Sequence, residues 1–303
     1  MKGNPPTAGR RFTAGMVLLL AAFLCLSGAY GQDAATLRAR HMALGEQLAS
    51  SPFQRPLVLH STQTDGTLKG DVYALMAHPF RVVGPALEAM EHWCDILILH
   101  LNVKYCRGRS SPAGSVLGVA VGRRFDQPLS DAYRVDFAYR VVARRPDYLQ
   151  VLLDAESGPL GTRDYRIVFE AIPFDATSSF VHMSYSYGYG LTARVAMQTY
   201  LATIGRDKVG FSVVARNDDG TAVYVDNVRG VVERNTMRYF LAIEAYLGAY
   251  SMPLAAQPEK RLRDWFAATE RYPRQLHELE REQYLAMKRR ELARQRAAPV
   301  TAH

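Results

Sequence analysis

Residues 226–250 have the periodicity of one long helix, and they follow directly after a series of strand-like segments. Their apolar side chains recur at helical spacing and form one stripe, made of Val228, Val231, Val232, Tyr239, Ala242, Ile243, Tyr246 and Tyr250. One polar residue, Asn235, interrupts this stripe. A curved sheet closed by a single long helix either fills its interior with side chains or keeps a hollow for a ligand. The choice between these arrangements decides what such a chain can do.

Asn235 needs a partner if the helix is buried, because an unpaired buried amide costs roughly 1–3 kcal/mol. A backbone carbonyl group or a buried water molecule is one such partner. The head group of a bound ligand is the other.

The segments that precede this helix alternate between apolar and polar residues, as half-buried strands do. In residues 180–189, for example, Val181, Met183, Tyr185 and Tyr187 share one face. The turns between successive segments are short, which favours antiparallel neighbours. In order, the sequence predicts helix 35–50, strands 56–64 and 67–77, helix 79–93 with a break at Pro85, strands 96–106, 115–123, 134–143, 148–156, 162–172 and 180–189, helix 191–204, and a hairpin at 209–216 and 221–227. This order indicates an α+β fold.

Three parts of the sequence carry a resemblance to a known superfamily: residues 70–74 before the predicted helix pair, the strands at 134–189, and the start of the long helix at Val231, Glu233, Arg234 and Asn235. Their order over residues 55–250 resembles the helix-grip fold of the START-like (SRPBCC) superfamily. The resemblance implies a curved antiparallel sheet wrapped around a long C-terminal helix. It also implies that the space between them holds a lipid, a sterol or an aromatic ligand. Carried over to this chain, the ligand-binding residues are Tyr139, Tyr165, Met183, Tyr185, Tyr187, Asn235, Tyr239 and Tyr246.

Tyrosine is abundant, with 17 residues in the chain. A tyrosine ring can line an apolar pocket while its hydroxyl group contacts the polar end of a ligand. Tyrosines are also common in strands, where the rings simply pack in the core. The leading hypothesis is a protein that binds a lipid or another hydrophobic small molecule and, by extension, shuttles it. The alternatives are an enzyme of the cyclase or hydrolase type that uses a tyrosine, His182 or Arg140 as acid–base group, and a filled envelope protein that acts through its C-terminal helices.

The sequence contains no recognisable catalytic motif. It has no Gly-x-Ser-x-Gly nucleophile elbow, and the spacing of His92 and His100 around Cys94 fits no zinc pattern, so we predict no metal and no cofactor. Residues 188–193 match the outline Gly-x-Gly-x-x-Ala of a dinucleotide fingerprint. The strand before them is rich in tyrosine and serine, whereas a buried parallel strand is continuously apolar. The glycines are therefore predicted to permit a tight strand-to-helix turn.

Residues 1–31 are predicted to be a signal peptide. Cationic residues at positions 2, 10 and 11 precede an apolar core at 16–26, which is short for a membrane span, and Ala29-Tyr30-Gly31 offers small residues for cleavage before Gln32. We therefore expect a periplasmic or secreted bacterial protein. Lipid attachment at Cys25 and an uncleaved membrane anchor are the alternatives.

Two cysteines follow the predicted cleavage site. Cys94 and Cys106 lie in one short stretch, and in an oxidising compartment such a pair usually forms a disulfide. Two free thiols are the alternative. A redox-active pair normally has the spacing Cys-x-x-Cys, which is absent here.

The C-terminal part differs in composition from the rest. The formal net charge of +8 falls to +5 when Lys2, Arg10 and Arg11 are left out, and +4 of that remainder lies beyond residue 256. The body of the protein is therefore almost neutral, and we expect no nucleic-acid partner. Trp265-Phe266 and Lys288-Arg289-Arg290 favour contact of residues 258–296 with a membrane surface or a partner protein, and packing on the chain's own domain is the alternative.

The predicted organisation is a signal peptide at 1–31, an N-terminal helix at 32–54, a START-like domain at 55–252, an amphipathic helical extension at 253–296 broken by Pro273, and a disordered tail at 297–303.

Overall fold

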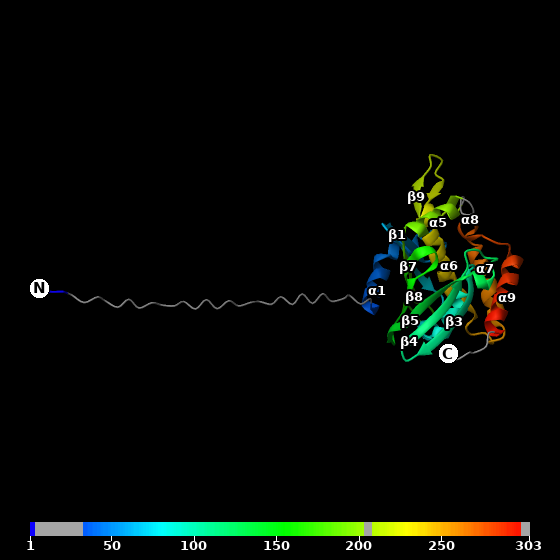
Figure 1. Cartoon of the computed structure of the whole chain (residues 1–303), viewed down its shortest axis with the longest axis horizontal. Coiled ribbons are helices and arrows are strands. Elements are labelled where there is room, and N and C mark those ends of the chain that lie inside the picture. The colour runs from blue at the N-terminus through cyan, green and yellow to red at the C-terminus, as the bar shows by residue number, and fades with distance from the viewer. Residues whose placement is uncertain (4–32, 203–207, 298–303) are drawn as a thin grey trace. The chain divides into compact units, whose positions relative to one another are not determined.

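The computed structural model describes residues 1–3, 33–202 and 208–297 (Figure 1). The described residues from Asp33 onward belong to one compact unit. Apart from its first three residues, the predicted signal peptide lies outside the described residues, and so does the predicted tail from residue 298 onward. No helix in the described part of the chain is long and apolar enough to cross a bilayer.

One antiparallel sheet of eight strands forms the body of the protein, in the order β1-β2-β8-β7-β6-β5-β4-β3. The strands β5 to β8 form the predicted meander, and β8 pairs with β2, which brings the N-terminal hairpin against it. The α+β fold class is confirmed. The bounds of the strands are β1 (Leu57–Thr64), β2 (Thr67–Met76), β3 (Val103–Ser111), β4 (Gly114–Val121), β5 (Tyr133–Arg145), β6 (Tyr148–Ser157), β7 (Thr162–Pro173) and β8 (Ser179–Tyr189).

The long helix α6 (Asn227–Ala249) lies against the inner face of this sheet and contacts β1, β2 and β8. Most of its apolar stripe is buried, with Val232, Ala242, Ile243 and Tyr246 at most 1% exposed, whereas Val231, Tyr239 and Tyr250 are half-buried. Two short helices, α3 (Phe80–Glu88) and α4 (Met90–Leu97), connect β2 to β3 and also pack on α6. The helix α5 (Leu191–Ala202) follows β8 and contacts α6 from another side.

Two N-terminal helices, α1 (Ala34–Ala43) and α2 (Gly45–Ala49), cover part of the outer face. Their apolar side chains join a second, smaller core, which consists of Ala34, Leu37, Leu44, Leu48, Val58, Tyr73, Tyr148, Ile172 and Phe180. The sheet is therefore buried on both faces where these helices lie, and α1 contacts β7 there.

The helix α6 approaches the sheet most closely at Gly70 of β2. A side chain at this position would overlap with the hydroxyl group of Thr236, which is fully buried and donates a hydrogen bond of 2.7 Å to the carbonyl oxygen of Val232. We expect Gly70→Ala to lower the free energy of unfolding by about 1–3 kcal/mol, because a packed core has no room for an added methyl group. Urea denaturation measures this loss.

Two further variants test that explanation. The double variant Gly70→Ala/Thr236→Ala should recover part of the lost stability, since it removes the overlapping hydroxyl group. Gly45→Ala is the control, because a side chain there meets no atom within 4 Å. A loss at Gly70 no larger than at Gly45 would contradict the close approach.

The predicted bounds of three elements are wrong: the strand at 96–106, the helix pair before it, and the last hairpin. The strand predicted at 96–106 begins only at Val103, because α4 continues to Leu97 and buries Met90, Trp93 and Cys94 at helical spacing. The helix break lies at Ala89, which has an extended backbone, and α3 runs through Pro85.

The last hairpin is also shorter than predicted, with strands β9 (Val213–Arg216) and β10 (Ala222–Tyr224). The reason lies in α6. The backbone N–H groups of Phe211 and Ser212 donate hydrogen bonds of 2.6 and 2.9 Å to the buried carboxylate of Glu233, which interrupts the strand ladder there. The two segments still share backbone hydrogen bonds, from Gly210 to Val225 at 2.6 Å and from Val225 to Ser212 at 2.8 Å. In Figure 1 the β9 hairpin projects from one end of the molecule.

The C-terminal segment forms three helices, α7 (Gln257–Thr269), α8 (Pro273–Leu276) and α9 (Arg281–Ala297), which pack on the sheet domain (Figure 1). The indole N–H group of Trp265 donates a hydrogen bond of 3.0 Å to the carbonyl oxygen of Arg238 in α6. The hydroxyl group of Tyr284 donates one of 3.0 Å to the carbonyl oxygen of Leu99. Trp265 is 1% exposed and Lys288 is fully buried, so neither side chain lies at the surface, where a membrane would contact it.

Two buried lysines share one carboxylate beneath α9. The ammonium group of Lys104 lies 2.9 Å from one oxygen of Glu291, and that of Lys288 lies 2.7 Å from the other. Lys288 also donates hydrogen bonds of 2.6 and 2.9 Å to the carbonyl oxygens of His100 and Val103. Burial lowers the pKa of Lys288 to about 8 in spite of the opposing charge of Glu291. This cluster attaches α9 to the start of β3.

Cys94 and Cys106 form a disulfide bond, which joins α4 to β3. The side-chain oxygen of Gln295 in α9 accepts a hydrogen bond of 3.0 Å from the backbone N–H group of Cys106. The disulfide, β3 and the last helix therefore form one connected region.

Candidate functional site

Four tyrosines gather between the inner face of the sheet and α6. Tyr165 comes from β7, Tyr185 and Tyr187 come from β8, and Tyr239 comes from α6; we call them the tyrosine cluster. Alternation along β8 places Tyr185 and Tyr187 on the same face, which is the one that α6 covers. The ring centroids of Tyr165 and Tyr187 are 5.3 Å apart in a stacked arrangement, and those of Tyr185 and Tyr239 are also 5.3 Å apart.

The hydroxyl groups of this cluster differ in their partners. That of Tyr165 donates a hydrogen bond of 2.9 Å to Thr162, and that of Tyr187 lies 3.8 Å from the sulfur of Met197 in α5. Within the residues that the structure describes, the hydroxyl groups of Tyr185 and Tyr239 have no hydrogen-bond partner. Both hydroxyl groups are therefore free to form a hydrogen bond with a group from outside the protein.

The tyrosines of the cluster are uncharged at neutral pH. Burial raises the pKa of Tyr165, Tyr187 and Tyr239, and it raises that of Tyr185 furthest above the usual value. Each hydroxyl group therefore keeps its proton and can both donate and accept a hydrogen bond.

His100 extends this cluster from the segment between α4 and β3. Its ring stacks on that of Tyr239 at a centroid distance of 4.8 Å, and it is only 4% exposed. Burial, together with the charges of Arg238 and Lys288, lowers the pKa of His100 well below its usual value, while the neighbouring Asn235 side chain acts in the opposite direction. The imidazole is therefore neutral.

The backbone of Asn102 selects the tautomer of His100. Its N–H group donates a hydrogen bond of 3.2 Å to Nδ1, so the ring proton is on Nε2. In the described part of the chain, Nε2 has no hydrogen-bond partner. We define the polar end of the site by four residues: Tyr185, Tyr239, His100 and the half-buried Asn235. It presents hydrogen-bonding groups without a net charge.

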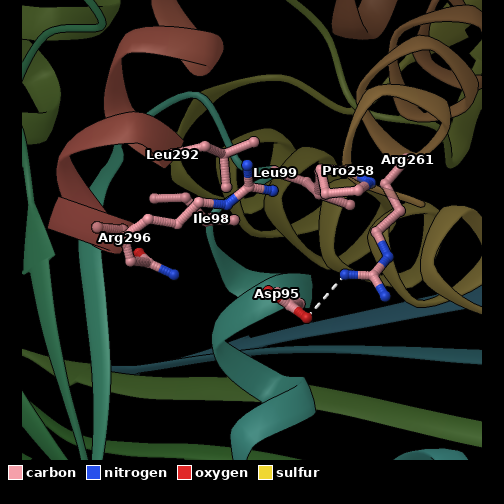
Figure 2. Close-up of a pocket in the computed structure, with 8 residues that line it drawn as sticks. Asp95, Ile98, Leu99, Pro258, Arg261, Leu292 and Arg296 are labelled. Carbon is pink, nitrogen blue, oxygen red and sulfur yellow. Dashed lines mark hydrogen bonds and ion pairs between the residues drawn. The ribbon is translucent and has the colours of Figure 1, made fainter. Parts of the chain in front are cut away.

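Three hollows bounded by described residues lie outside the tyrosine cluster. A cavity of about 50 Å³ between α4, α7 and α9 is shown in Figure 2, where Arg261 forms an ion pair of 2.7 Å with Asp95. Its volume suits an ordered water molecule and no larger ligand. A shallow depression of about 640 Å³ lies beside the β1–β2 turn, and a groove of about 480 Å³ lies next to α3. The described residues contain no group of three or more histidine, cysteine or acidic side chains placed to hold a metal ion.

No protein-family model and no curated protein matches the chain. Similar solved structures include a conserved protein from Geobacillus kaustophilus, a START superfamily protein from Mycobacterium smegmatis and the Zhui aromatase/cyclase from a Streptomyces species. They are 11%, 12% and 11% identical in sequence to this chain, with TM-scores of 0.35, 0.31 and 0.31. The matches cover 60%, 46% and 69% of this chain and 95%, 92% and 95% of those chains.

Identities and TM-scores as low as these carry no argument about function, so the fold is assigned from its topology. An antiparallel sheet holds a long helix near the C-terminal end against its inner face, and two short helices connect β2 to β3. The fold is a helix grip. The helix-grip arrangement predicted from the sequence is thereby confirmed.

The helix grip brings five of the eight predicted ligand-binding residues together, namely Tyr165, Tyr185, Tyr187, Asn235 and Tyr239. The other three lie apart from the cluster. Met183 is fully buried in the core, and the hydroxyl group of Tyr139 donates a hydrogen bond of 2.5 Å to the carbonyl oxygen of Glu88 at the end of α3. The ring of Tyr246 packs against His92, and the guanidinium group of Arg261 lies 4.3 Å from its centre.

The two charged residues predicted as acid–base groups of an enzyme are not inside the helix grip. His182 points to the outer face, where its ring nitrogens lie 2.8 Å from Asp71 and 2.7 Å from Glu170. Arg140 is exposed and forms an ion pair of 2.6 Å with Asp154. Alternation along each strand explains both positions, since these residues have the opposite parity to the inward-facing side chains.

The glycine-rich turn at 188–193 has no dinucleotide-binding context. Gly188 pairs with Thr67 on one side and Arg163 on the other, and both neighbouring strands are antiparallel. A dinucleotide fingerprint belongs to a parallel strand–helix–strand unit. The turn between β8 and α5 is therefore a tight connection, as predicted.

Sequence reasoning missed His100 as a member of the site. We considered it only as a metal ligand, because Cys94 and His92 are its neighbours in sequence. Its contact with Tyr239 joins residues 139 positions apart and depends on how α4 packs against α6. No local pattern in the sequence encodes this contact.

Proposed function

We propose that this chain binds a hydrophobic small molecule or lipid between the inner face of the sheet and α6, with an uncharged polar group of that molecule at the polar end of the site. The observation that supports this proposal is the set of hydrogen-bonding groups on Tyr185, Tyr239 and His100 that have no partner among the described residues and lie beside the stacked rings of the cluster. The rings would contribute apolar contact area, and the polar groups would orient the ligand. The same arrangement is consistent with carrying the molecule unchanged.

Native mass spectrometry of the purified protein tests this proposal. We expect a bound mass in the range of a lipid or sterol that disappears when the protein is extracted with organic solvent. A homogeneous apo mass, together with no uptake of the uncharged fluorescent sterol dehydroergosterol, would contradict the proposal.

A tyrosine variant then locates the ligand. Tyr239→Phe keeps the ring and removes one hydroxyl group, so we expect the affinity for the co-purified molecule to fall about 2- to 10-fold, as the loss of one neutral hydrogen bond predicts. Tyr246→Phe, in the same helix but away from the cluster, is the control and should bind as the wild type does. Equal affinities of the two variants would place the ligand elsewhere.

We also propose that the chain is exported, with cleavage before Gln32. The N-terminal sequence pattern and the disulfide between Cys94 and Cys106 support this, since structural disulfides are typical of oxidising compartments. Expression in a bacterial host followed by N-terminal sequencing of the periplasmic fraction should give a chain that begins at Gln32. A full-length chain retained in the cytoplasm would contradict export.

A further inference from the structure

The groove of about 480 Å³ lies outside the tyrosine cluster and shares no residue with it. It is bounded by the first turns of α3, the turn between β5 and β6, and the turn between β7 and β8. Its volume is within the range of sites for small organic ligands.

The walls of the groove are mainly apolar and contain rigid residues. Phe80 contributes an aromatic ring, and Pro79, Pro85, Pro146 and Pro173 contribute rings with a restricted backbone. Tyr148 and Leu149 lie behind this surface and are 0% and 2% exposed. A surface restrained in this way loses little conformational freedom when a ligand binds.

The charged residues around the groove leave an excess of positive charge. Arg81, Arg144 and Arg145 line it together with the acidic residues Glu88 and Asp175. Glu88 is paired with Arg144 at 2.9 Å. The carboxylate of Asp175 accepts hydrogen bonds of 2.7 Å from the backbone N–H groups of Thr177 and Ser178.

Two guanidinium groups of the groove form no ion pair within the described residues, although the charge of Arg145 helps to lower the pKa of the carboxylates of Asp33 and Asp147. Arg81 donates a hydrogen bond of 3.1 Å to the carbonyl oxygen of Ala176, which carries no charge. Arg145 forms no ion pair or hydrogen bond through its side chain with any residue that the structure describes. A carboxylate or sulfonate is the natural partner of such a group, because the planar guanidinium fork matches its geometry.

We propose that this groove is a second binding site, for a small amphipathic anion whose apolar body lies against Phe80 and the proline rings and whose acidic group pairs with Arg145 and Arg81. The two sites then differ in the chemistry that they select. The polar end between sheet and helix offers uncharged hydrogen-bonding groups, whereas the groove offers cations at the rim of an apolar surface.

Fluorescence titration with cis-parinarate, a fatty-acid anion, tests the second site in the full mature chain. In the double variant Arg145→Gln/Arg81→Gln, the affinity for parinarate should fall at least 5-fold. The affinity for the methyl ester of the same fatty acid should stay unchanged in this variant. Arg140→Gln is the matched control, since Arg140 also lies on β5 but away from the groove, and it should bind parinarate as the wild type does. Raised salt should weaken the binding of the anion to the wild type and not that of the ester.

The proposal is overturned if parinarate does not bind, or if the Arg145/Arg81 and Arg140 variants bind it equally. It is also overturned if Tyr239→Phe, rather than the arginine variants, weakens parinarate binding, because the anion then occupies the space beneath α6. The second site does not rest on the first, so an empty tyrosine cluster leaves these outcomes unchanged.

Discussion

Glu291→Gln is expected to lower the free energy of unfolding by about 3–5 kcal/mol, the loss that follows when one partner of a buried charge cluster is removed. The carboxylate of Glu291 is shared by Lys104 and Lys288, and all three side chains are at most 4% exposed. Glutamine has nearly the same shape but no charge, so two ammonium groups are left buried without a counter-ion. Chemical denaturation followed by tryptophan fluorescence measures the change, since Trp265 lies among the same helices.

Glu282→Gln is the matched control for this prediction. Glu282 is also in α9, but its side chain is 78% exposed, so its loss should change stability by less than about 0.5 kcal/mol. A loss below 1 kcal/mol for Glu291→Gln would show that the buried cluster does not stabilise the packing of α9.

The same cluster predicts a pH dependence. The pKa of Lys288 is about 8 in the folded protein and returns to its ordinary value of 10.5 on unfolding. Between these two values the unfolded chain binds more protons than the folded chain, so the contribution of Lys288 to stability rises with pH across that window. Thermal unfolding of the wild type and of Lys288→Met between pH 7 and pH 10.5 should show this rise in the wild type only.

His182→Leu is the second substitution expected to have a large effect, again about 3–5 kcal/mol. The ring of His182 is 2% exposed and joins Asp71 to Glu170, which in turn accepts a hydrogen bond from Tyr148. Without the imidazole, Glu170 and Asp71 lie close together and only Asp71 keeps a cationic partner, Lys69, at 3.0 Å. The exposed His60 on β1 provides the control, and His60→Leu should leave the unfolding midpoint nearly unchanged.

The effect of His182 should itself depend on pH. Burial alone would lower the pKa of His182, but the hydrogen bonds to Asp71 and Glu170 outweigh it and raise the pKa above 6.5. The stabilisation is therefore complete below pH 6.5 and is lost as the pH rises through the folded value. Burial would raise the pKa of Asp71, yet the bond to His182 lowers it below 3.8, so this contribution is lost only in stronger acid.

The difference in stability between wild type and His182→Leu should accordingly be greatest between pH 3.8 and pH 6.5. Denaturation series at several pH values measure it. A difference that grows steadily above pH 7 would have the wrong sign for a protonated histidine between two carboxylates.

Much of the fold follows from local patterns in the sequence. The strands β5 to β8 were predicted to within a few residues, because a half-buried strand repeats its apolar side chains every two positions. The helix α6 was predicted from its 3.6-residue period in the same way. Where one period did not dominate, as in 90–106, helix and strand were confused, because Met90–Leu97 and the strand that follows are both almost continuously apolar.

The candidate site was predicted in part. Alternation along β8 and the stripe on α6 were enough to place Tyr185, Tyr187 and Tyr239 on facing surfaces. The sequence did not show that Tyr139 and Tyr246 lie away from the cluster. Alternation along a strand or helix predicts which face a residue is on, but its position along the sheet depends on strand register and helix packing. Equally, nothing near Trp265 or Lys288 in the sequence showed that both side chains are buried beneath the C-terminal helices.

By itself, the sequence determined most of the strands and helices, that the sheet is antiparallel, and that an apolar helix closes it, because each of these follows from contacts or periods within a few residues. Only the tertiary structure decided that His100 meets Tyr239, that His182 pairs with Asp71 and Glu170, and that Lys104 and Lys288 share Glu291. These contacts join residues that mostly lie more than a hundred positions apart. Their geometry depends on how whole elements pack, which no local pattern records.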